Sequence, residues 1–281
     1  MRLGQIRLRG QITAAIFGGS EARPIIGYSL RGAIERAEAL GESLAEFAGL
    51  VTVGEPVKAE PLIPIHPAEV WGCGCTYQSS AAFRDAEHGT REGFYAGVYN
   101  GARPEVFFKG TSRVCVGPGD AIGIRSDSSF TAPEPELALL LGSKGQILGY
   151  MLANDVSAWD IERENPLYLP QSKTFSGCCA LGPVIVTPDE IADPRGIEIR
   201  CRITRGGVEI FSGEASTARL NRSFGTLIEF LFRSNPVPAG TVLLTGTGII
   251  VTEDAALRDG DVVSISAPGI GELTNPASVV S

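Results

Sequence analysis

The segment that decides the fold is TAPEPELALLL, residues 131–141, where two carboxylates open a run that is otherwise apolar. In a β-strand, residues i and i+2 point to the same face of the sheet. Glu134 and Glu136 are therefore expected on one face, with Leu137 and Leu139 on the other. Two like charges held together are unfavourable unless a cation or a proton neutralises them. The pattern indicates either the solvent-facing end of a strand or a cation site.

A third carboxylate follows after a turn. The turn GSKG, residues 142–145, leads into QILGYMLA, residues 146–153, which is typical of a returning strand and ends at Asn154-Asp155. A hairpin would bring Asp155 back beside Glu134 and Glu136. Three carboxylates without histidine or cysteine form a hard, oxygen-rich ligand set. This set suits Mg²⁺, with Mn²⁺ or Ca²⁺ as alternatives, rather than zinc.

Two further ionisable residues, Glu162 and Lys173, lie close by in the sequence. If the segment DVSAWDIE is helical, Glu162 and Asp155 share one face of the helix. A bound cation would disfavour the charged form of Lys173 and lower its pKa towards acid–base work. The alternatives are a solvated helix face for Glu162 and an exposed lysine for Lys173.

Composition excludes several classes of partner. The chain has 281 residues, of which 43% are hydrophobic and 20% charged, which is enough for a large core. A net charge of −8 argues against nucleic acid and anionic membrane surfaces as partners. No apolar run approaches the ~20 residues that span a bilayer, and the first residues lack the pattern of a signal peptide. We therefore expect a soluble, cytoplasmic protein.

The cysteines do not form a metal-binding pattern. Six cysteines and two histidines are present, without a C-x-x-C pair. A structural zinc site needs four such ligands at tight spacing. The cysteines are expected to be reduced, small and buried.

The chain is predicted to divide into residues 1–62, a small N-terminal module, and residues 63–281, a catalytic metal-binding domain. The first part contains an alternating hairpin pattern in QIRLRGQITAAIF and helical spacing over residues 29–50. The second part is a series of short β-rich segments with one clear helix, RSFGTLIEFLFRSN, that ends at Asn235-Pro236. The predicted fold class is mostly β with a few helices (α+β), as a mixed β-sandwich or roll.

An ordered series of motifs resembles the fumarylacetoacetate hydrolase superfamily over about residues 65–280. The series is EPELA from Glu134, NDVSAWDI from Asn154, Lys173-Thr174, TGTG from Thr245 and GIGELTNP from Gly269. The resemblance implies the superfamily's mixed β-sandwich roll. It also implies that Glu134, Glu136 and Asp155 are metal ligands. Lys173 would then be catalytic beside the bound keto acid, and Thr247 would help to hold the substrate carboxylate.

Within the superfamily, residues 103–141 and NDVSAWDIERENPLYLPQSKTF are most similar to the 2-keto-3-deoxy sugar-acid dehydratases. This implies a metal-dependent hydro-lyase of sugar-acid and pentose catabolism, which converts 2-dehydro-3-deoxy-arabinonate to 2,5-dioxopentanoate and water. Members of the superfamily usually form homodimers, so the resemblance implies a homodimer or a higher homo-oligomer. Lys173 and Glu162 are the candidates for the proton transfers, without an assignment of acid and base. The candidates for other substrate contacts, each with a structural role as the alternative, are Tyr77, Ser80, Arg84 and Lys109.

At two positions the sequence differs from the pattern of the superfamily, and both differences affect the expected reaction. Relatives that hydrolyse C–C bonds carry an Asn-Tyr-x-x-His element, but in CTYQSSAAF Ser80 occupies the position of the histidine, and His88 lies eight residues further on. A hydroxyl alone is a poor base for water. Trp159 stands where many relatives have arginine in SARD, so a substrate contact from that arginine does not carry over.

Two alternative functions and one alternative role for Lys173 remain open. A metal-dependent hydrolase of a 1,3-diketo acid would use the same ligands, although the missing histidine counts against it. Lys173 could instead form a Schiff base, a role that a metal triad makes redundant. A non-enzymatic Ca²⁺-binding module explains the carboxylates but neither Lys173 nor TGTG.

Overall fold

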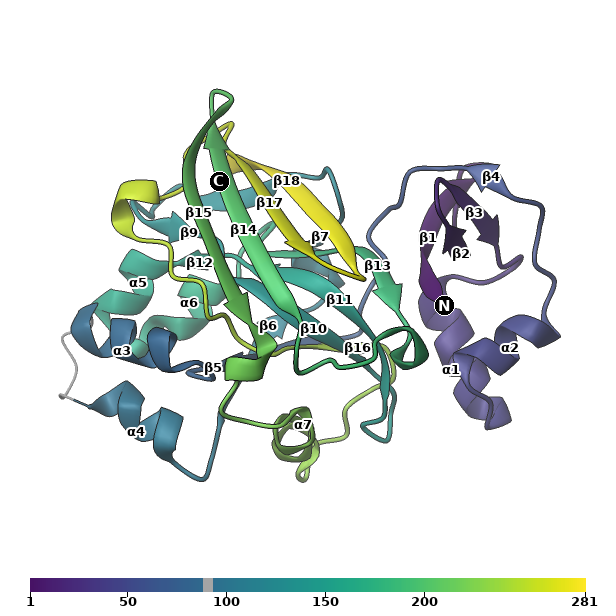
Figure 1. Ribbon diagram of the computed structural model, residues 1–281, viewed down its shortest axis with the longest axis horizontal. Helices are drawn as coiled ribbons and strands as arrows, with labels where there is room; N and C mark the ends of the chain where they lie inside the picture. The colour runs from purple at the N-terminus through teal and green to yellow at the C-terminus, as the bar shows by residue number, and fades with distance from the viewer. Residues whose placement is uncertain (88–92) are drawn as a thin grey trace.

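The computed structural model describes residues 1–87 and 93–281 (Figure 1). Its large sheet has the strand order β4-β3-β2-β1-β13-β11-β10-β16-β5-β6, and β7 pairs with β13. A second sheet has the order β15-β14-β17-β18-β8, and β12 pairs with β9 in a two-stranded sheet. The strands of the large sheet are β1 Arg2–Leu8, β2 Gln11–Gly18, β3 Glu21–Pro24, β4 Val57–Lys58, β5 Val70–Gly74, β6 Glu105–Gly110, β7 Cys115–Val116, β10 Pro135–Leu141, β11 Ile147–Asp155, β13 Cys179–Val186 and β16 Thr241–Leu244.

The remaining elements cover or connect the sheets. The other strands are β8 Ile122–Arg125, β9 Thr131–Ala132, β12 Ser157–Ala158, β14 Glu198–Arg205, β15 Val208–Ser216, β17 Val262–Ala267 and β18 Gly271–Val280. The α-helices are α1 Leu30–Leu40, α2 Leu44–Leu50, α3 Gln78–Glu87, α4 Phe94–Asn100, α5 Trp159–Glu164, α6 Leu169–Lys173 and α7 Phe224–Phe232. This composition, with multiple sheets and few long helices, confirms the predicted fold class.

The hairpin of β10 and β11 forms as the sequence predicts. Pro135 pairs with Asn154 and Glu136 with Ala153, and the backbone N–H of Asp155 donates to the carbonyl of Glu134 at 2.9 Å. Every residue of β10 is buried, because the sheet is covered on both faces there. This hairpin therefore fixes its carboxylates on a rigid, buried strand pair.

The two faces of β10 lie in different parts of the core. Leu137, Leu139 and Leu141 pack in the cluster that includes Ile203 of β14 and Ile265 of β17, so the second sheet covers this face. Ala138 and Leu140 belong to the cluster that includes residues of α1 and α2. By alternation, Glu136 lies on the same face as Ala138 and Leu140, and away from Leu137, as predicted.

Residues 1–62 form the predicted hairpin, but two helices instead of one continuous helical segment. Gly41, at φ 76°, ends α1, and Ser43 starts α2 with a capping box to Glu46. The strands of this part join the large sheet, since Leu3 of β1 pairs with Ile185 of β13. Figure 1 shows these elements gathered at one end of the molecule. The division at residue 62 stays a prediction.

The segment DVSAWDIE is helical only in its second half, so the condition for a shared helix face of Asp155 and Glu162 is not met. Asp155 ends β11, Ser157 pairs with Ala132 in β12, and α5 begins only at Trp159. The pairing with β9 keeps the backbone extended at Ser157 and Ala158. Pattern analysis also misses α3 and α4, two short helices that follow β5.

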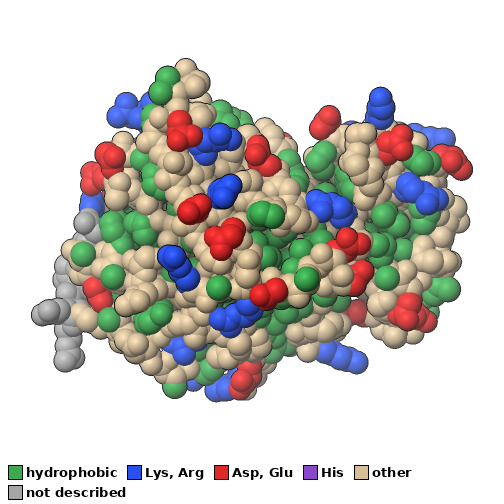
Figure 2. Space-filling model, in the orientation of Figure 1, with side chains coloured by type: hydrophobic (Ala, Val, Ile, Leu, Met, Phe, Trp, Pro, Cys, Tyr) green, Lys and Arg blue, Asp and Glu red, His purple; other side chains and the backbone are tan. Residues whose placement is uncertain are grey.

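The described surface carries charged side chains of both signs. Figure 2 shows acidic and basic side chains interspersed over the described residues of one face. Among residues 1–87 and 93–281, no helix has the length and apolar content required to cross a membrane.

Substitution of a β10 core residue tests this arrangement. Leu139 has no exposed surface, so Leu139→Ala is expected to lower the free energy of unfolding by about 2–5 kcal/mol in chemical denaturation. Leu50 is 66% exposed, and Leu50→Ala serves as the control, with an expected change within about 0.5 kcal/mol. Equal effects of the two substitutions would contradict the buried position of β10.

Candidate metal centre and active site

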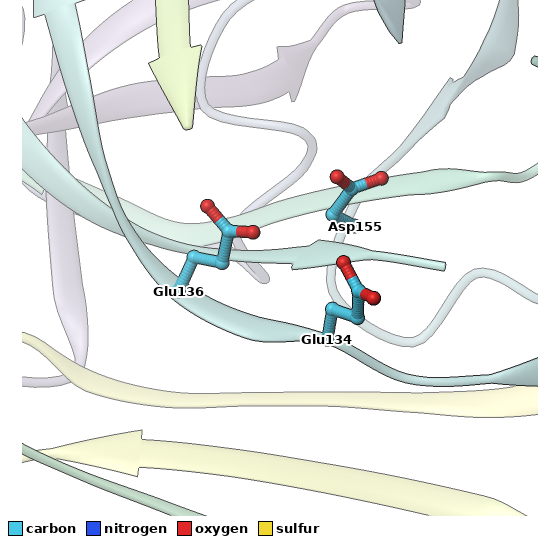
Figure 3. Close-up of side chains that lie close together, drawn as sticks. All are labelled: Glu134, Glu136 and Asp155. Atoms are coloured by element: carbon cyan, nitrogen blue, oxygen red, sulfur yellow. The ribbon is translucent and has the colours of Figure 1, made fainter. Parts of the chain in front are cut away.

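Glu134, Glu136 and Asp155 converge from the ends of the β10–β11 hairpin (Figure 3). One carboxylate oxygen of each lies within 4.8 Å of the others, and each residue is at most 4% exposed. The hairpin register accounts for this convergence, because Asp155 follows the residue paired with Pro135. The three predicted metal ligands therefore do come together.

Each carboxylate is held by a donor from a different part of the chain. Lys173 Nζ donates to Glu134 Oε2 at 2.6 Å, and the Gly246 N–H donates to Glu136 Oε2 at 2.5 Å. Lys109 Nζ lies 2.5 Å from Asp155 Oδ1 and forms an ion pair with it. The surrounding protein thus fixes the orientation of all three side chains.

Burial and mutual repulsion shift the carboxyl pKa values. Burial raises the pKa of Glu136 well above its usual range, and the charges of Asp155 and Glu134 add to this shift. Burial also raises the pKa of Glu134, although Lys173 opposes it. For Asp155, burial alone would raise the pKa, but Lys109 and Lys173 outweigh it and hold the pKa below its usual value.

The donor set fits a hard divalent cation. All three candidate ligands are carboxylate oxygens, the atoms that Mg²⁺, Mn²⁺ and Ca²⁺ prefer. Glu134 Oε1 is buried and, among the residues that the structure describes, accepts no hydrogen bond. Arg84 Nη2 is 3.9 Å from this oxygen. A cation shared by the three carboxylates would satisfy Glu134 Oε1 and relieve the repulsion.

Lys173, the last residue of α6, lies inside this acidic cluster. Its Nζ donates to Ser157 Oγ at 2.6 Å and to Asp155 Oδ2 at 3.4 Å, besides Glu134. Burial opposes its charge, but Asp155, Glu134 and Glu162 outweigh burial and raise the pKa of Lys173. The sequence analysis expected a lowered pKa from a bound cation. The carboxylates that surround the ammonium group account for the raised pKa, and the lowering by a bound cation stays a prediction.

Glu162 reaches the same region from α5. It is 2% exposed, and its oxygens lie 3.2 Å from Arg84 Nη2 and 3.8 Å from Lys173 Nζ. Ser172 Oγ donates to Glu162 Oε2 at 3.2 Å. The ammonium group of Lys173 therefore lies beside both Glu162 and Asp155. The two carboxylates do not share one face of a helix.

Arg84 and Lys109 bind carboxylates of the site. Arg84 Nη1 lies 3.4 Å from Glu105 Oε2, in addition to its ion pair with Glu162. Burial opposes the charge of Arg84, but Glu162 and Glu105 outweigh it and raise the pKa. The substrate contacts predicted for Arg84 and Lys109 remain predictions. Sequence reasoning missed Glu105, Ser157 and Ser172, although Glu105 and Lys109 stand four apart in one strand and so share a face.

Tyr77, Ser80 and Thr247 are buried near this region. A Cβ on Gly248 would lie 2.6 Å from Tyr77 Cδ1, so the ring of Tyr77 packs against the TGTG turn. Thr247 Oγ1 accepts the N–H of Ile249 at 3.1 Å and stabilises the same turn. Ser80, in α3, is 4% exposed. Their substrate contacts remain predictions, and His88 lies outside the described residues.

The side chains of Trp159 and of every cysteine except Cys115 are buried. The ring of Trp159 packs against Phe83 and Phe130 in the core, with the Arg84 guanidinium 5.5 Å from its centroid. All six cysteines are free thiols, and only Cys115 is not fully buried. These observations agree with the predicted reduced, buried cysteines.

Comparison with known proteins identifies the family. Residues 89–278 match the family model described as fumarylacetoacetate (FAA) hydrolase C-terminal, so the chain belongs to the fumarylacetoacetate hydrolase family. It is 49% identical over 216 residues to the 2-dehydro-3-deoxy-D-arabinonate dehydratase of Saccharolobus solfataricus, across 76% of this chain and 72% of that one. It is 43% identical over 218 residues to a probable 2-keto-3-deoxyxylonate dehydratase of Haloferax volcanii, across 78% and 75%.

A solved structure extends this similarity to the whole chain. The structure of 2-keto-3-deoxy-D-arabinonate dehydratase complexed with magnesium and 2,5-dioxopentanoate superimposes with a TM-score of 0.86 at 39% identity. The match covers 100% of this chain and 99% of that chain. The similarity therefore includes residues 1–62, which the sequence motifs left uncovered.

Metal binding should be measurable as a change in stability. A ligand that binds only the folded state, at about 100 times its Kd, adds about 2.7 kcal/mol to the free energy of unfolding. We expect Mg²⁺ to raise the melting temperature by several degrees and EDTA to reverse the effect. Glu136→Gln should abolish the shift, while the exposed control Glu229→Gln keeps it. A Glu136→Gln protein with the full shift would remove Glu136 from the metal ligands.

Proposed function

We propose that this protein is a divalent-metal-dependent dehydratase of a 2-keto-3-deoxy sugar acid. The substrate that the relatives favour is 2-dehydro-3-deoxy-arabinonate, and the products are 2,5-dioxopentanoate and water. One observation carries the proposal: three buried carboxylates with a fully buried lysine in contact with two of them. The two dehydratase relatives and the magnesium-bound structure support the same reaction and the same metal.

The reaction removes a proton from C3 and the hydroxyl from C4, which leave as water, and forms a C3=C4 double bond. Loss of a proton from C5 and addition of a proton at C3 move the double bond to C4=C5, and this enol tautomerises to the C5 aldehyde. A bound divalent cation supplies Lewis-acid polarisation of the 2-keto oxygen. The residues that would hold it are Glu134, Glu136 and Asp155. Thr247, in the adjacent turn, is the candidate for binding the substrate carboxylate.

The proton transfers fall to Lys173 and Glu162. Glu134, Asp155 and Ser157 orient the Lys173 ammonium group, and Arg84 and Ser172 orient the Glu162 carboxylate. The two groups lie 3.8 Å apart, so a proton on one is within reach of the other after a small movement. Burial of both side chains excludes bulk water from their surroundings. Which of the two takes the C3 proton is left to experiment.

The family resemblance also carries finer proposals. We infer a homodimer with a cytoplasmic role in pentose and sugar-acid catabolism, and a division into residues 1–62 and 63–281. Mn²⁺ is the natural substitute for Mg²⁺ in this oxygen-rich site, and Ca²⁺ is the third candidate.

The product distinguishes the dehydratase from a hydrolase. Incubation with 2-dehydro-3-deoxy-arabinonate and Mg²⁺ is expected to give 2,5-dioxopentanoate, detected by NMR, and EDTA is expected to stop the reaction. An acylpyruvate should not be cleaved, because Ser80 supplies no base that activates water. Release of pyruvate from the acylpyruvate, without turnover of the sugar acid, would favour the diketo-acid hydrolase. Trapping of the protein by borohydride would favour a Schiff base at Lys173.

Replacement of Lys173 tests its role in proton transfer. Lys173→Met is expected to lower kcat by about 10²–10⁴-fold, the usual contribution of a positioned acid–base group. Circular dichroism and the Mg²⁺-induced shift of the melting temperature should show that the variant folds and still binds metal. The exposed Lys144→Met is the matched control and should turn over normally. Near-normal turnover by Lys173→Met would remove Lys173 from the chemistry.

A further inference from the structure

Lys109 lies in an edge strand of the large sheet, and its side chain reaches the candidate metal ligand Asp155. It belongs to β6, which β10, β16 and β5 separate from β11 in the strand order. Nevertheless its Nζ lies 2.5 Å from Asp155 Oδ1 and donates to the carbonyl of Val156 at 2.9 Å. The side chain has no exposed surface. The sheet therefore curves back far enough for its edge strand to contact the end of β11.

The backbone of Lys109 is fixed as firmly as its side chain. Thr174 Oγ1 donates to the Lys109 carbonyl at 3.1 Å, and Thr174 directly follows Lys173. The next residue, Gly110, has φ 151°, and a Cβ there would lie 2.7 Å from Val114 Cγ2. Lys109 is thus anchored to the segment that carries Lys173, so its ammonium group has little freedom to leave Asp155.

Asp155 differs from the other two carboxylates in how it is held. Lys109 contacts its Oδ1, and Lys173 donates to its Oδ2 at 3.4 Å. Glu134 is held less closely on one side, because Lys173 Nζ lies 2.6 Å from its Oε2 but Arg84 Nη2 lies 3.9 Å from its Oε1. A carboxylate with a cationic partner on each oxygen is poorly placed to chelate a metal ion with both oxygens. It can still offer one, since a carboxylate oxygen accepts more than one interaction.

The number of protein oxygens bears on the choice of ion. Mg²⁺ takes six oxygens at about 2.0–2.1 Å and usually keeps several waters, whereas Ca²⁺ takes about 6–8 at 2.3–2.6 Å, often from a bidentate carboxylate. We infer that Lys109 is a positioning residue that limits Asp155 to one metal-binding oxygen and so makes the site prefer Mg²⁺ or Mn²⁺ over Ca²⁺. This inference rests on the metal site of the proposed function.

The wild-type protein allows a direct test. Mn²⁺ is bound to the metal site without substrate, and its exchangeable waters are counted from the EPR line broadening in ¹⁷O-enriched water. Three single-oxygen carboxylates in a six-coordinate site leave about three waters. A count of two or fewer would overturn the inference while leaving metal binding intact. Failure to bind Mn²⁺ at all would overturn the proposed function as well.

Substitution of Lys109 tests its part in selectivity. Mg²⁺ and Ca²⁺ affinities are measured by calorimetry for wild type, Lys109→Met and the cation-retaining Lys109→Arg. We expect the ratio of Ca²⁺ to Mg²⁺ affinity to rise at least about tenfold in Lys109→Met and to return towards wild type in Lys109→Arg. Lys144→Met is the control for a lost surface charge and should keep the wild-type ratio. A folded Lys109→Met protein with the wild-type ratio would overturn the inference; if that variant does not fold, the water count decides.

Discussion

The structure depends on how three buried carboxylates are kept together. Glu134, Glu136 and Asp155 lose most of their solvation and repel one another, and the raised pKa values of both glutamates report this. Lys109 and Lys173 supply the opposing charge at contact distance. Buried ion pairs contribute little net stability, but loss of one partner is strongly destabilising. The network is therefore better explained by the ion and substrate that it orients than by stability.

The rigid β10–β11 hairpin holds the three carboxylates at defined distances from one another. The carboxylates extend from a strand pair whose residues are buried on both faces, in contact with the second sheet on one side and with the α1–α2 core cluster on the other. A side chain on such a strand has few alternative positions, so the distances between the carboxylates vary little. Binding sites on rigid strands are held more accurately than sites on loops.

Glycine provides the space that the charged groups need. A Cβ on Gly74 would lie 2.0 Å from Glu105 Oε2, and one on Gly246 would lie 2.0 Å from Thr76 Oγ1. Gly246 also has φ 95°, which favours glycine, and its N–H binds Glu136. The ion pair of Arg84 with Glu105 and the hydrogen bond to Glu136 both require these positions to lack a side chain.

The sequence by itself determined the β10–β11 hairpin and the candidate metal ligands, because alternation and a short turn are local and place Glu134, Glu136 and Asp155 at one end of two paired strands. The ordered motifs also identified the family, because each motif is a short, local stretch of sequence. Only the tertiary structure decided the partners of these carboxylates. Lys109 comes from β6 and Arg84 from α3, both distant in the chain from the carboxylates that they contact, and the break before α5 follows from pairing with β9. Such contacts join residues far apart in the chain, where no periodicity in the sequence records them.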